Sequence, residues 1–333
     1  MRRLALFILL PVFTGCARFS ATPQGVPVQL VTTAGATGHL PAELAESLGF
    51  YRQEGLNVTI TRMSSSAKVM QSLIGGSADV ACAGQQHLIQ LAAEGKIVQA
   101  FVAEFNNPGY SLVVSPAASK KIGKVGDLKG ELVGVSAPGG GHHTFLNYVL
   151  SKHGISPQDV SIVAIGVGAP SLAALERGTV SAAVADLVTI SWLKRRYPNL
   201  ILLADTSTRE GMRRIFGSET SYQYTLCASP EWLRRNREAA RRMAAAIVRT
   251  LQWIHSHSPE QVREKLPDAS RTQDVQSDLE ALRIAIPFFS SDGVISPESA
   301  QVAREAAEAT VAKIRNADID LAKTYTNDLV REK

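Results

Sequence analysis

Apolar and polar positions along the chain form short blocks that predict strands alternating with helices. Apolar runs rich in β-branched residues predict strands at 28–32, 56–63, 78–83 and 98–105. Apolar residues at helical spacing predict helices at 40–48, 67–74 and 85–94. Strands that alternate with helices and are punctuated by glycine favour a parallel sheet covered by helices, so the chain is expected to be an α/β protein.

The same blocks return about one hundred residues further along the chain. Residues 31–40 read VTTAGATGHL and residues 135–144 read VSAPGGGHHT. Each is the end of an apolar run, then a loop of small residues with glycine, then a histidine at the start of a predicted helix. A repeat of this length is a lobe rather than a solenoid unit. Two lobes that each present a glycine-rich loop predict a cleft for a small molecule between them.

The pattern also places the boundary between the two lobes. Predicted strands of the second half lie at 132–136, 160–165, 182–185 and 201–204, predicted helices at 144–153, 169–176 and 190–196, and a loop at 206–219. Residues 111–115 and 222–228 are extended and are predicted to cross between the lobes. We expect a first lobe of residues 28–110 and 228–333, ending in helices that include a long one at 237–257, and a second lobe of 111–227. Two crossing strands make a hinge suited to closure around a ligand.

Composition allows an ordinary globular core and gives little sign of nucleic-acid binding. Hydrophobic residues make up 45% of the 333 residues and charged residues 20%, and the formal net charge is +5. Loss of Arg2 and Arg3 with a leader peptide would reduce this charge to +3. The arginines of 234–242 predict a solvated helix face, since no aromatic side chains are interleaved with them. No nucleic-acid partner is expected.

The N-terminal segment predicts export. Residues 1–15 carry two arginines and then an apolar stretch, which is the pattern of a secretory signal peptide. This stretch is shorter than the about 20 residues needed to span a bilayer. Thr14-Gly15-Cys16 is similar to the cleavage box of bacterial lipoproteins, although Phe13 stands where leucine is usual. Residues 16–27 would then be a lipidated Cys16 and a linker that tether the protein to a membrane, with simple secretion as the alternative.

Cys82 and Cys227 both fall in predicted strands. In an exported chain they could form a disulfide, but two small buried apolar side chains are the favoured interpretation. The sequence shows no Cys-x-x-Cys motif and no Cys/His spacing typical of metal ligands. We therefore predict no metal site and no cofactor from the sequence.

Several stretches together resemble a known family. They are residues 49–58 (GFYRQEGLNV), 127–130 (DLKG) with 133–135 (VGV), 75–80 (GGSADV) and 289–293 (FSSDG). This set resembles the solute-binding receptors of bacterial ABC importers for nitrate, aliphatic sulfonates, taurine and thiamine-precursor pyrimidines. The resemblance implies a type II, two-lobe periplasmic-binding-protein fold with two parallel or mixed sheets flanked by helices. It also implies a monomer in the periplasm or cell envelope that delivers cargo to a permease and an ATPase.

Loops at the carboxyl ends of the predicted strands should form the ligand site, because open α/β sheets bind ligands there. The candidate ligand-binding residues are Gly35, Thr37, His39, Ser64, Ser65, Ser66, Gln85, Gln86, Gly139, Gly140, Gly141, His142, His143, Thr144 and Asp186.

The chemistry of these candidates points in two directions. The three glycines before the helix at 144–153 let a ligand approach its free N–H groups closely, which suits a sulfonate or carboxylate. A neutral histidine beside a helix N-terminus can donate a hydrogen bond. Asp186 would instead repel a simple anion and bind an amine or a ring N–H, which favours taurine-like zwitterions or aminopyrimidines. Connecting loops and helix caps are the structural alternatives for these residues.

Two other functions remain open from the sequence. An enzyme similar to the pyrimidine-precursor synthase could use the same fold, but this chain lacks that enzyme's cysteine-rich motif and carries an export signal. A sensory ligand-binding module would need a membrane or signalling segment or a separate partner chain. Solute reception for transport is therefore the main hypothesis, and no enzymatic activity is expected.

Overall fold

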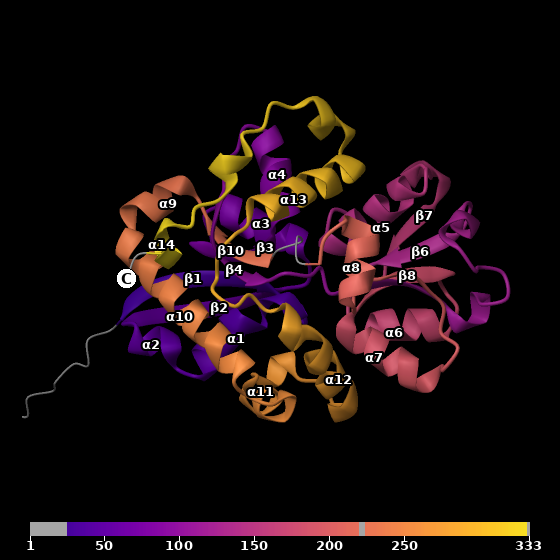
Figure 1. Cartoon of the computed structure of the whole chain (residues 1–333), viewed down its shortest axis with the longest axis horizontal. Helices are drawn as coiled ribbons and strands as arrows, with labels where there is room; N and C mark the ends of the chain where they lie inside the picture. The colour runs from indigo at the N-terminus through magenta and orange to yellow at the C-terminus, as the bar shows by residue number, and fades with distance from the viewer. Residues whose placement is uncertain (1–24, 220–223, 332–333) are drawn as a thin grey trace, which may run out of the picture.

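Two five-stranded sheets lie at the centres of two lobes that stand side by side (Figure 1). The computed structural model describes residues 25–219 and 224–331. The predicted leader peptide and the predicted lipidation site at Cys16 lie outside these residues.

The first sheet has the strand order β2-β1-β3-β10-β4. Its strands are β1 (Val26–Thr33), β2 (Leu56–Met63), β3 (Val80–Gly84), β4 (Gln99–Phe105) and β10 (Tyr224–Ala228). β1 runs parallel to β2 and β3, whereas β10 runs antiparallel to β3 and β4. Every residue of β3 and β10 is buried, as expected for central strands covered on both faces.

The second sheet repeats this plan with the order β7-β6-β8-β5-β9. Its strands are β5 (Tyr110–Val114), β6 (Leu132–Val135), β7 (Ser161–Ala164), β8 (Ala182–Asp186) and β9 (Leu202–Asp205). β6 is parallel to β7 and β8, and β5 is antiparallel to β8 and β9. Each sheet thus combines four strands that run in one direction with a single strand, β10 or β5, that runs in the opposite direction.

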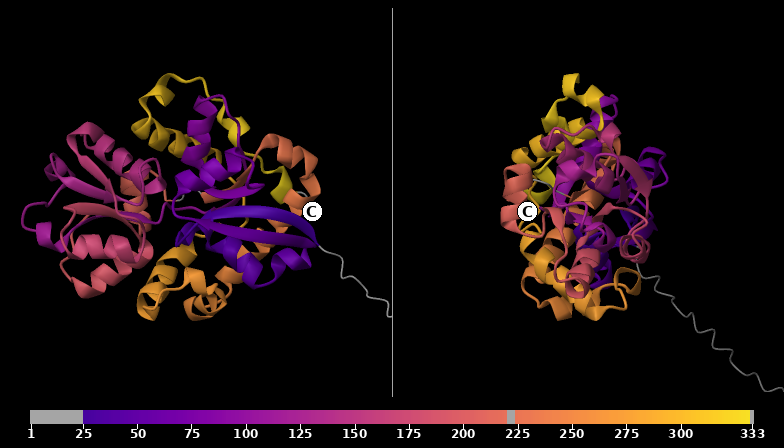
Figure 2. Two further views of the ribbon diagram at one scale, coloured as in Figure 1. Left: turned by 180° about the vertical axis from the view of Figure 1, so that it is seen from behind. Right: turned by 90° about the vertical axis from the view of Figure 1, so that its right-hand side faces the viewer.

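Helices cover both faces of each sheet (Figures 1 and 2). Those of the first lobe are α1 (Leu40–Ser47), α2 (Phe50–Gln53), α3 (Ser66–Ile74), α4 (Gln85–Ala93), α9 (Pro230–Arg235), α10 (Arg237–His255), α11 (Pro259–Lys265), α12 (Val275–Ala285), α13 (Pro297–Thr310) and α14 (Asp328–Arg331). Those of the second lobe are α5 (Gly141–Lys152), α6 (Ala169–Glu176), α7 (Leu187–Arg196) and α8 (Arg209–Phe216). Short 3-10 turns connect them, among them η1 (Thr37–His39). The predicted α/β architecture with two mixed sheets is therefore present.

Helix α8 corrects the prediction of a loop over 206–219. Thr208 caps its N-terminus by accepting a hydrogen bond from the Gly211 N–H, and Gly217 ends it with φ of 78°. Met212 and Phe216, four residues apart, are buried on one side of this helix. The polar composition of the segment hid this pair because the other side of α8 carries arginines.

The long helix α10 anchors the core of the first lobe. Met243, Ile247, Leu251 and Ile254 lie at helical spacing and are fully buried. Complete burial of side chains of this size contributes about 1.5–3 kcal/mol each relative to exposure.

Helices of the first lobe also hold the second lobe on two sides. α12 packs against α7, and α13 packs against α5 (Figure 1). Ion pairs accompany both contacts: Arg195 with Asp274, and Lys152 with Glu305 at 3.6 Å. The two lobes are therefore in contact around the cleft.

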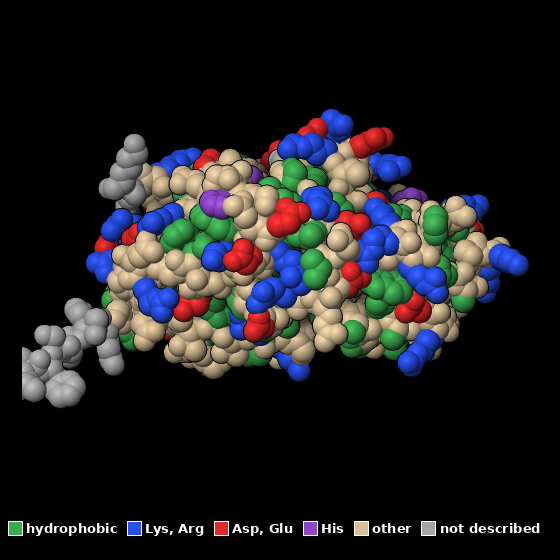
Figure 3. All heavy atoms as spheres, turned by 90° about the horizontal axis from the view of Figure 1, so that it is seen from below, with side chains coloured by type: hydrophobic (Ala, Val, Ile, Leu, Met, Phe, Trp, Pro, Cys, Tyr) green, Lys and Arg blue, Asp and Glu red, His purple; other side chains and the backbone are tan. Residues whose placement is uncertain are grey.

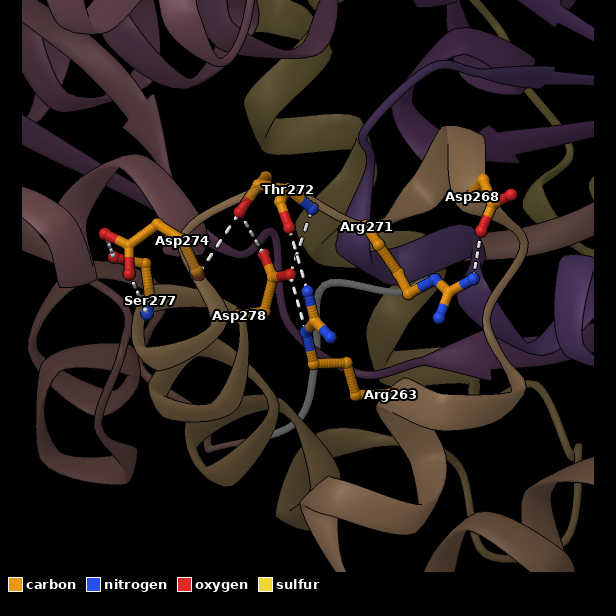
Figure 4. A network of polar contacts seen from close by, with 7 residues as sticks. All are labelled: Arg263, Asp268, Arg271, Thr272, Asp274, Ser277 and Asp278. Atoms are coloured by element: carbon orange, nitrogen blue, oxygen red, sulfur yellow. Dashed lines mark hydrogen bonds and ion pairs between the residues drawn. The ribbon is translucent and has the colours of Figure 1, made fainter.

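Asp274, the partner of Arg195, lies in a network of hydrogen bonds and ion pairs that fixes the turn before α12 (Figure 4). Asp278 accepts hydrogen bonds from Arg263 Nε at 2.9 Å and from Thr272 Oγ1 at 2.7 Å. Asp274 itself caps α12 through Ser277. Because these contacts fix the turn within the first lobe, the Asp274 carboxylate is positioned to pair with Arg195 of the second lobe.

Basic and acidic side chains are interspersed on the face shown in Figure 3. Such mixing is typical of a solvated surface rather than a phosphate-binding stripe. Among the described helices, none is long and apolar enough to cross a membrane.

Candidate functional site

A pocket lies between the two lobes, with about 530 Å³ of atom-free space that is partly open to solvent. Seven of the predicted candidates line it: Gly35, Thr37, His39, Ser66, Gly141, His142 and Asp186. They come from the loops after β1, β2, β6 and β8, so the carboxyl ends of strands in both sheets meet at one place.

The other eight candidates are not part of this lining: Ser64, Ser65, Gln85, Gln86, Gly139, Gly140, His143 and Thr144. Ser65 caps α3 by accepting from the Lys68 N–H at 3.4 Å. The side chains of Gln85 and Gln86 at the start of α4 are buried, and their amides have no partner among the described residues. Their contact with a ligand stays a prediction.

Side chains accept hydrogen bonds from two N–H groups at the N-terminus of α5. The Gly141 N–H donates across the cleft to Ser66 Oγ at 3.1 Å, and the Gly139 N–H donates to His143 Nδ1 at 2.9 Å. A Cβ on Gly141 would stand 2.7 Å from the Tyr110 hydroxyl, so any other residue there would have to displace Tyr110. The Gly141 N–H, the first of the helix, therefore already has an acceptor.

Two tyrosines that sequence reasoning missed form the floor of the pocket. Tyr110 and Tyr224 begin the strands β5 and β10, and their hydroxyl groups hydrogen-bond to each other. Tyr110 packs edge-on against His142 with ring centroids 4.4 Å apart, and Tyr224 against His39 at 4.9 Å. In the sequence Tyr110 falls at the end of the predicted first lobe and Tyr224 inside a predicted crossing strand, and nothing in the local pattern singles out either ring.

Asp186 ends β8 and serves both as a helix cap and as part of the pocket. Its carboxylate accepts from the Thr189 N–H at 2.9 Å and from Thr189 Oγ1 at 3.1 Å. The side chain is 8% exposed and lines the pocket. Asp186 therefore provides negative charge at the wall.

His142 adds a neutral acceptor or donor beside that carboxylate. Burial lowers the pKa of His142 to about 4, although the charge of Asp186 opposes this shift. Its Nδ1 is buried without a partner among the described residues. No lysine or arginine occurs among the described residues that line the pocket. The described lining thus offers acceptors, hydroxyl groups and aromatic rings but no permanent cation.

A cluster beneath the pocket was also missed. His39, Cys82 and Glu104 are all buried, and the possible ligand atoms of the three lie within 4.8 Å of one another. His39 Nδ1 is 3.4 Å from Glu104 Oε2. Burial raises the pKa of the Cys82 thiol well above its usual value. Cys82 and Cys227 are free thiols, in agreement with the favoured interpretation of both as buried residues.

A family model described as NMT1/THI5 like matches residues 36–261. The binding protein YtlA of Bacillus subtilis is 24% identical over 237 residues, which are 69% of this chain and 66% of YtlA. A 4-amino-5-hydroxymethyl-2-methylpyrimidine phosphate synthase of Schizosaccharomyces pombe is 28% identical over 135 residues, or 40% of this chain and 38% of the synthase. The chain matches less than two thirds of the length of either relative.

Solved structures confirm the two-lobe fold. A protein from Bordetella bronchiseptica RB50 superposes with a TM-score of 0.86 at 30% identity, over 92% of this chain and 96% of that one. The alkanesulfonate-binding protein SsuA of Xanthomonas axonopodis pv. citri, bound to MOPS, superposes with a TM-score of 0.69 at 16% identity, over 91% and 99%. At that identity the likeness to SsuA concerns the fold alone.

Proposed function

This chain belongs to the NMT1/THI5-like family, and on that premise we propose that it is the extracytoplasmic receptor of an ABC importer. Its lobes close on a small polar solute, and the closed form delivers the solute to a membrane permease and its ATPase. The observation that carries the proposal is the pocket between the lobes, which strand ends of both sheets line. YtlA and SsuA, both named as binding proteins, support the same function.

Contacts across the cleft support closure as the working motion. The hydrogen bond from the Gly141 N–H to Ser66 Oγ joins the two walls of the pocket. The ion pairs of Arg195 with Asp274 and of Lys152 with Glu305 join the lobes away from it. A hinge motion that separates the lobes would break all three together, which is the behaviour expected of a two-state receptor.

The charges at the pocket favour a solute that carries an amino group. Asp186 contributes negative charge, and the lining residues described contribute no lysine or arginine. A bare anion such as nitrate would meet repulsion there, whereas a cationic amine gains from the carboxylate and from the faces of Tyr110 and Tyr224. Among the solutes of the resembled receptors, taurine-like zwitterions and aminopyrimidines fit this arrangement better than nitrate or simple sulfonates.

A matched set of solutes tests the proposal. Taurine and ethanesulfonate share a two-carbon sulfonate and differ in the amine, and an aminopyrimidine and nitrate extend the range. Thermal unfolding of the purified protein should show stabilisation by the amine-bearing solutes, about 2.7 kcal/mol at a hundredfold excess over the dissociation constant. Small-angle scattering should show closure with the same solutes.

Asp186→Asn should abolish the preference for the amine, while Asp205→Asn should keep it. Asp205 is a matched control because it also ends a strand, β9, but does not line the pocket. Stabilisation by nitrate and ethanesulfonate but not by taurine would refute the assigned solute class. Failure of every solute to stabilise or close the protein would count against the receptor function itself.

Attachment to the cell envelope is part of the proposal. We infer lipidation at Cys16 and a location in the periplasm or cell envelope, with the monomer as the functional unit. Mass spectrometry of the protein isolated from membranes should find a diacylglyceryl group on Cys16, and Cys16→Ser should release the protein into the soluble fraction. An unmodified N-terminus at another residue would contradict the anchor.

The synthase-like enzyme remains the second candidate, because one relative is named as a synthase. The match covers 38% of that enzyme, and the binding-protein neighbours favour reception over catalysis. Conversion of a bound aminopyrimidine to a new compound by the purified protein would decide for the enzyme.

A further inference from the structure

We propose that His39, Cys82 and Glu104 form a binding site for a divalent, zinc-like metal ion beneath the solute pocket. His39 ends η1, Cys82 lies in β3 and Glu104 in β4, so three separate segments converge on one point. This site goes beyond the receptor function and does not depend on it.

The donor set and its burial suit such an ion. An imidazole nitrogen, a thiolate and a carboxylate oxygen are the three ligand types that zinc prefers in proteins. His39 is 2% exposed, and Cys82 and Glu104 are fully buried. A buried carboxylate needs a compensating positive charge. A divalent ion bound by one thiolate, one carboxylate and a neutral imidazole gives a complex with no net charge. Such an ion would therefore offset the free-energy cost of burying the Glu104 carboxylate.

The distances are close to those of a metal site. The 3.4 Å between His39 Nδ1 and Glu104 Oε2 is longer than an ordinary N–H···O hydrogen bond, which spans about 2.7–3.2 Å. It nearly equals the edge of a tetrahedron of zinc ligands, about 3.3 Å for bonds of about 2.0–2.1 Å. The remaining separations reach at most 4.8 Å. A side-chain rotation that moves the Cys82 sulfur by about 1 Å would bring it within bonding distance of an ion held by His39 and Glu104.

The surroundings of the cluster supply positioning and further oxygen. The Ala42 N–H donates to Glu104 Oε1 at 3.1 Å and leaves Oε2 toward His39, as outer hydrogen bonds do for metal ligands. The hydroxyl groups of Thr32 and Tyr51 are buried without a partner among the described residues. Val31 pairs with Ala81 in the sheet, which places Thr32 beside Cys82. The Thr32 hydroxyl, beside Cys82, is therefore the candidate for a fourth ligand.

The pocket gives the ion a route to the cluster and a means of affecting solute binding. His39 lines the pocket, so an ion can reach its ring through the cleft when the lobes part. When Nδ1 binds a metal, the proton of the neutral imidazole must lie on Nε2. Metal binding would therefore fix His39 as a hydrogen-bond donor.

Cobalt(II) is a direct probe, because a cobalt–thiolate bond gives a charge-transfer band in the near ultraviolet. Titration of the metal-stripped protein with cobalt(II) should produce this band at one equivalent, and zinc should displace the cobalt. Cys82→Ser should lose the band, and Glu104→Gln should weaken cobalt binding by tenfold or more.

Cys227→Ser is the matched control. Cys227 is equally buried in the neighbouring strand β10 but packs in a separate apolar cluster with Val69 and Ile295, so its loss should leave the band unchanged.

If Cys82→Ser fails to fold, X-ray absorption of the zinc-loaded wild-type protein gives the same information, with one sulfur expected among the zinc neighbours. No band, a band that persists in Cys82→Ser, or a zinc shell without sulfur would overturn the proposal. None of these outcomes alters the solute test of the receptor function.

Discussion

Ser66→Ala should weaken solute binding by opening the cleft rather than by removing a ligand contact. Ser66 belongs to the first lobe, and its Oγ accepts from the Gly141 N–H of the second lobe at 3.1 Å. Gly141 is buried, so alanine at position 66 leaves a buried N–H without an acceptor in the closed form. In the open form water can take the place of the hydroxyl. Ser66 Oγ also lies 3.1 Å from His87 Nε2 within the first lobe, and alanine removes that contact in both forms. Only the lost contact with Gly141 falls on the closed form alone.

The size of the effect follows from that unpaired N–H. A buried donor without an acceptor costs about 1–3 kcal/mol. When a solute binds the closed form, this cost appears as an affinity about 5- to 150-fold weaker. Isothermal titration with a binding solute measures the affinity, and small-angle scattering measures the closed fraction without solute. Both should fall together in Ser66→Ala.

Ser65→Ala is the matched control for this experiment. Ser65 caps α3 within the first lobe by accepting from the Lys68 N–H. Its removal should lower the stability of the protein by about 1 kcal/mol and leave the affinity unchanged. Equal affinities for Ser66→Ala and the wild type, or an equal loss in both variants, would refute the role of the cross-cleft hydrogen bond.

Two further predictions concern stability. Burial lowers the pKa of His87 to about 4, so between pH 6.5 and 4 the unfolded chain takes up a proton that the folded one does not. Stability should be complete above pH 7 and fall through this window by up to about 3 kcal/mol for this residue, and urea denaturation of His87→Asn should show a flatter pH profile; an unchanged slope would contradict the buried neutral histidine. Gly211→Ala should destabilise the protein by about 1–3 kcal/mol, because its Cβ would lie 1.9 Å from the carbonyl oxygen of Asp205. A urea midpoint equal to that of the wild type would show that α8 can move without cost.

Local patterns in the sequence were enough to predict much of the fold. Hydrophobic runs and glycine stops located the strands of both sheets, and the repeated loops at His39 and His142 predicted a cleft at their carboxyl ends. The amphipathic spacing of α10 was visible because Met243 and Ile247 recur at helical intervals. Such signals depend on neighbours along the chain.

Features formed by distant segments could not be found in that way. Tyr110 and Tyr224 meet only because β5 and β10 cross between the lobes from opposite directions. Cys82 in β3 and Glu104 in β4 lie close together although β10 separates their strands in the sheet, an arrangement that no spacing in the sequence indicates. The capping role of Asp186 was one of two alternatives, and the structure shows that a cap can also line the pocket.

The equal strand order of the two sheets makes each strand of one lobe correspond to a strand of the other, with β5 corresponding to β10. In these terms the ring pair of Tyr110 and His142 corresponds to that of Tyr224 and His39. The correspondence fails in charge, since β8 ends in Asp186 where β3 ends in Gly84. A solute with one charged end therefore meets two similar walls that differ in polarity. It should bind in a single orientation, with its amino group toward the second lobe.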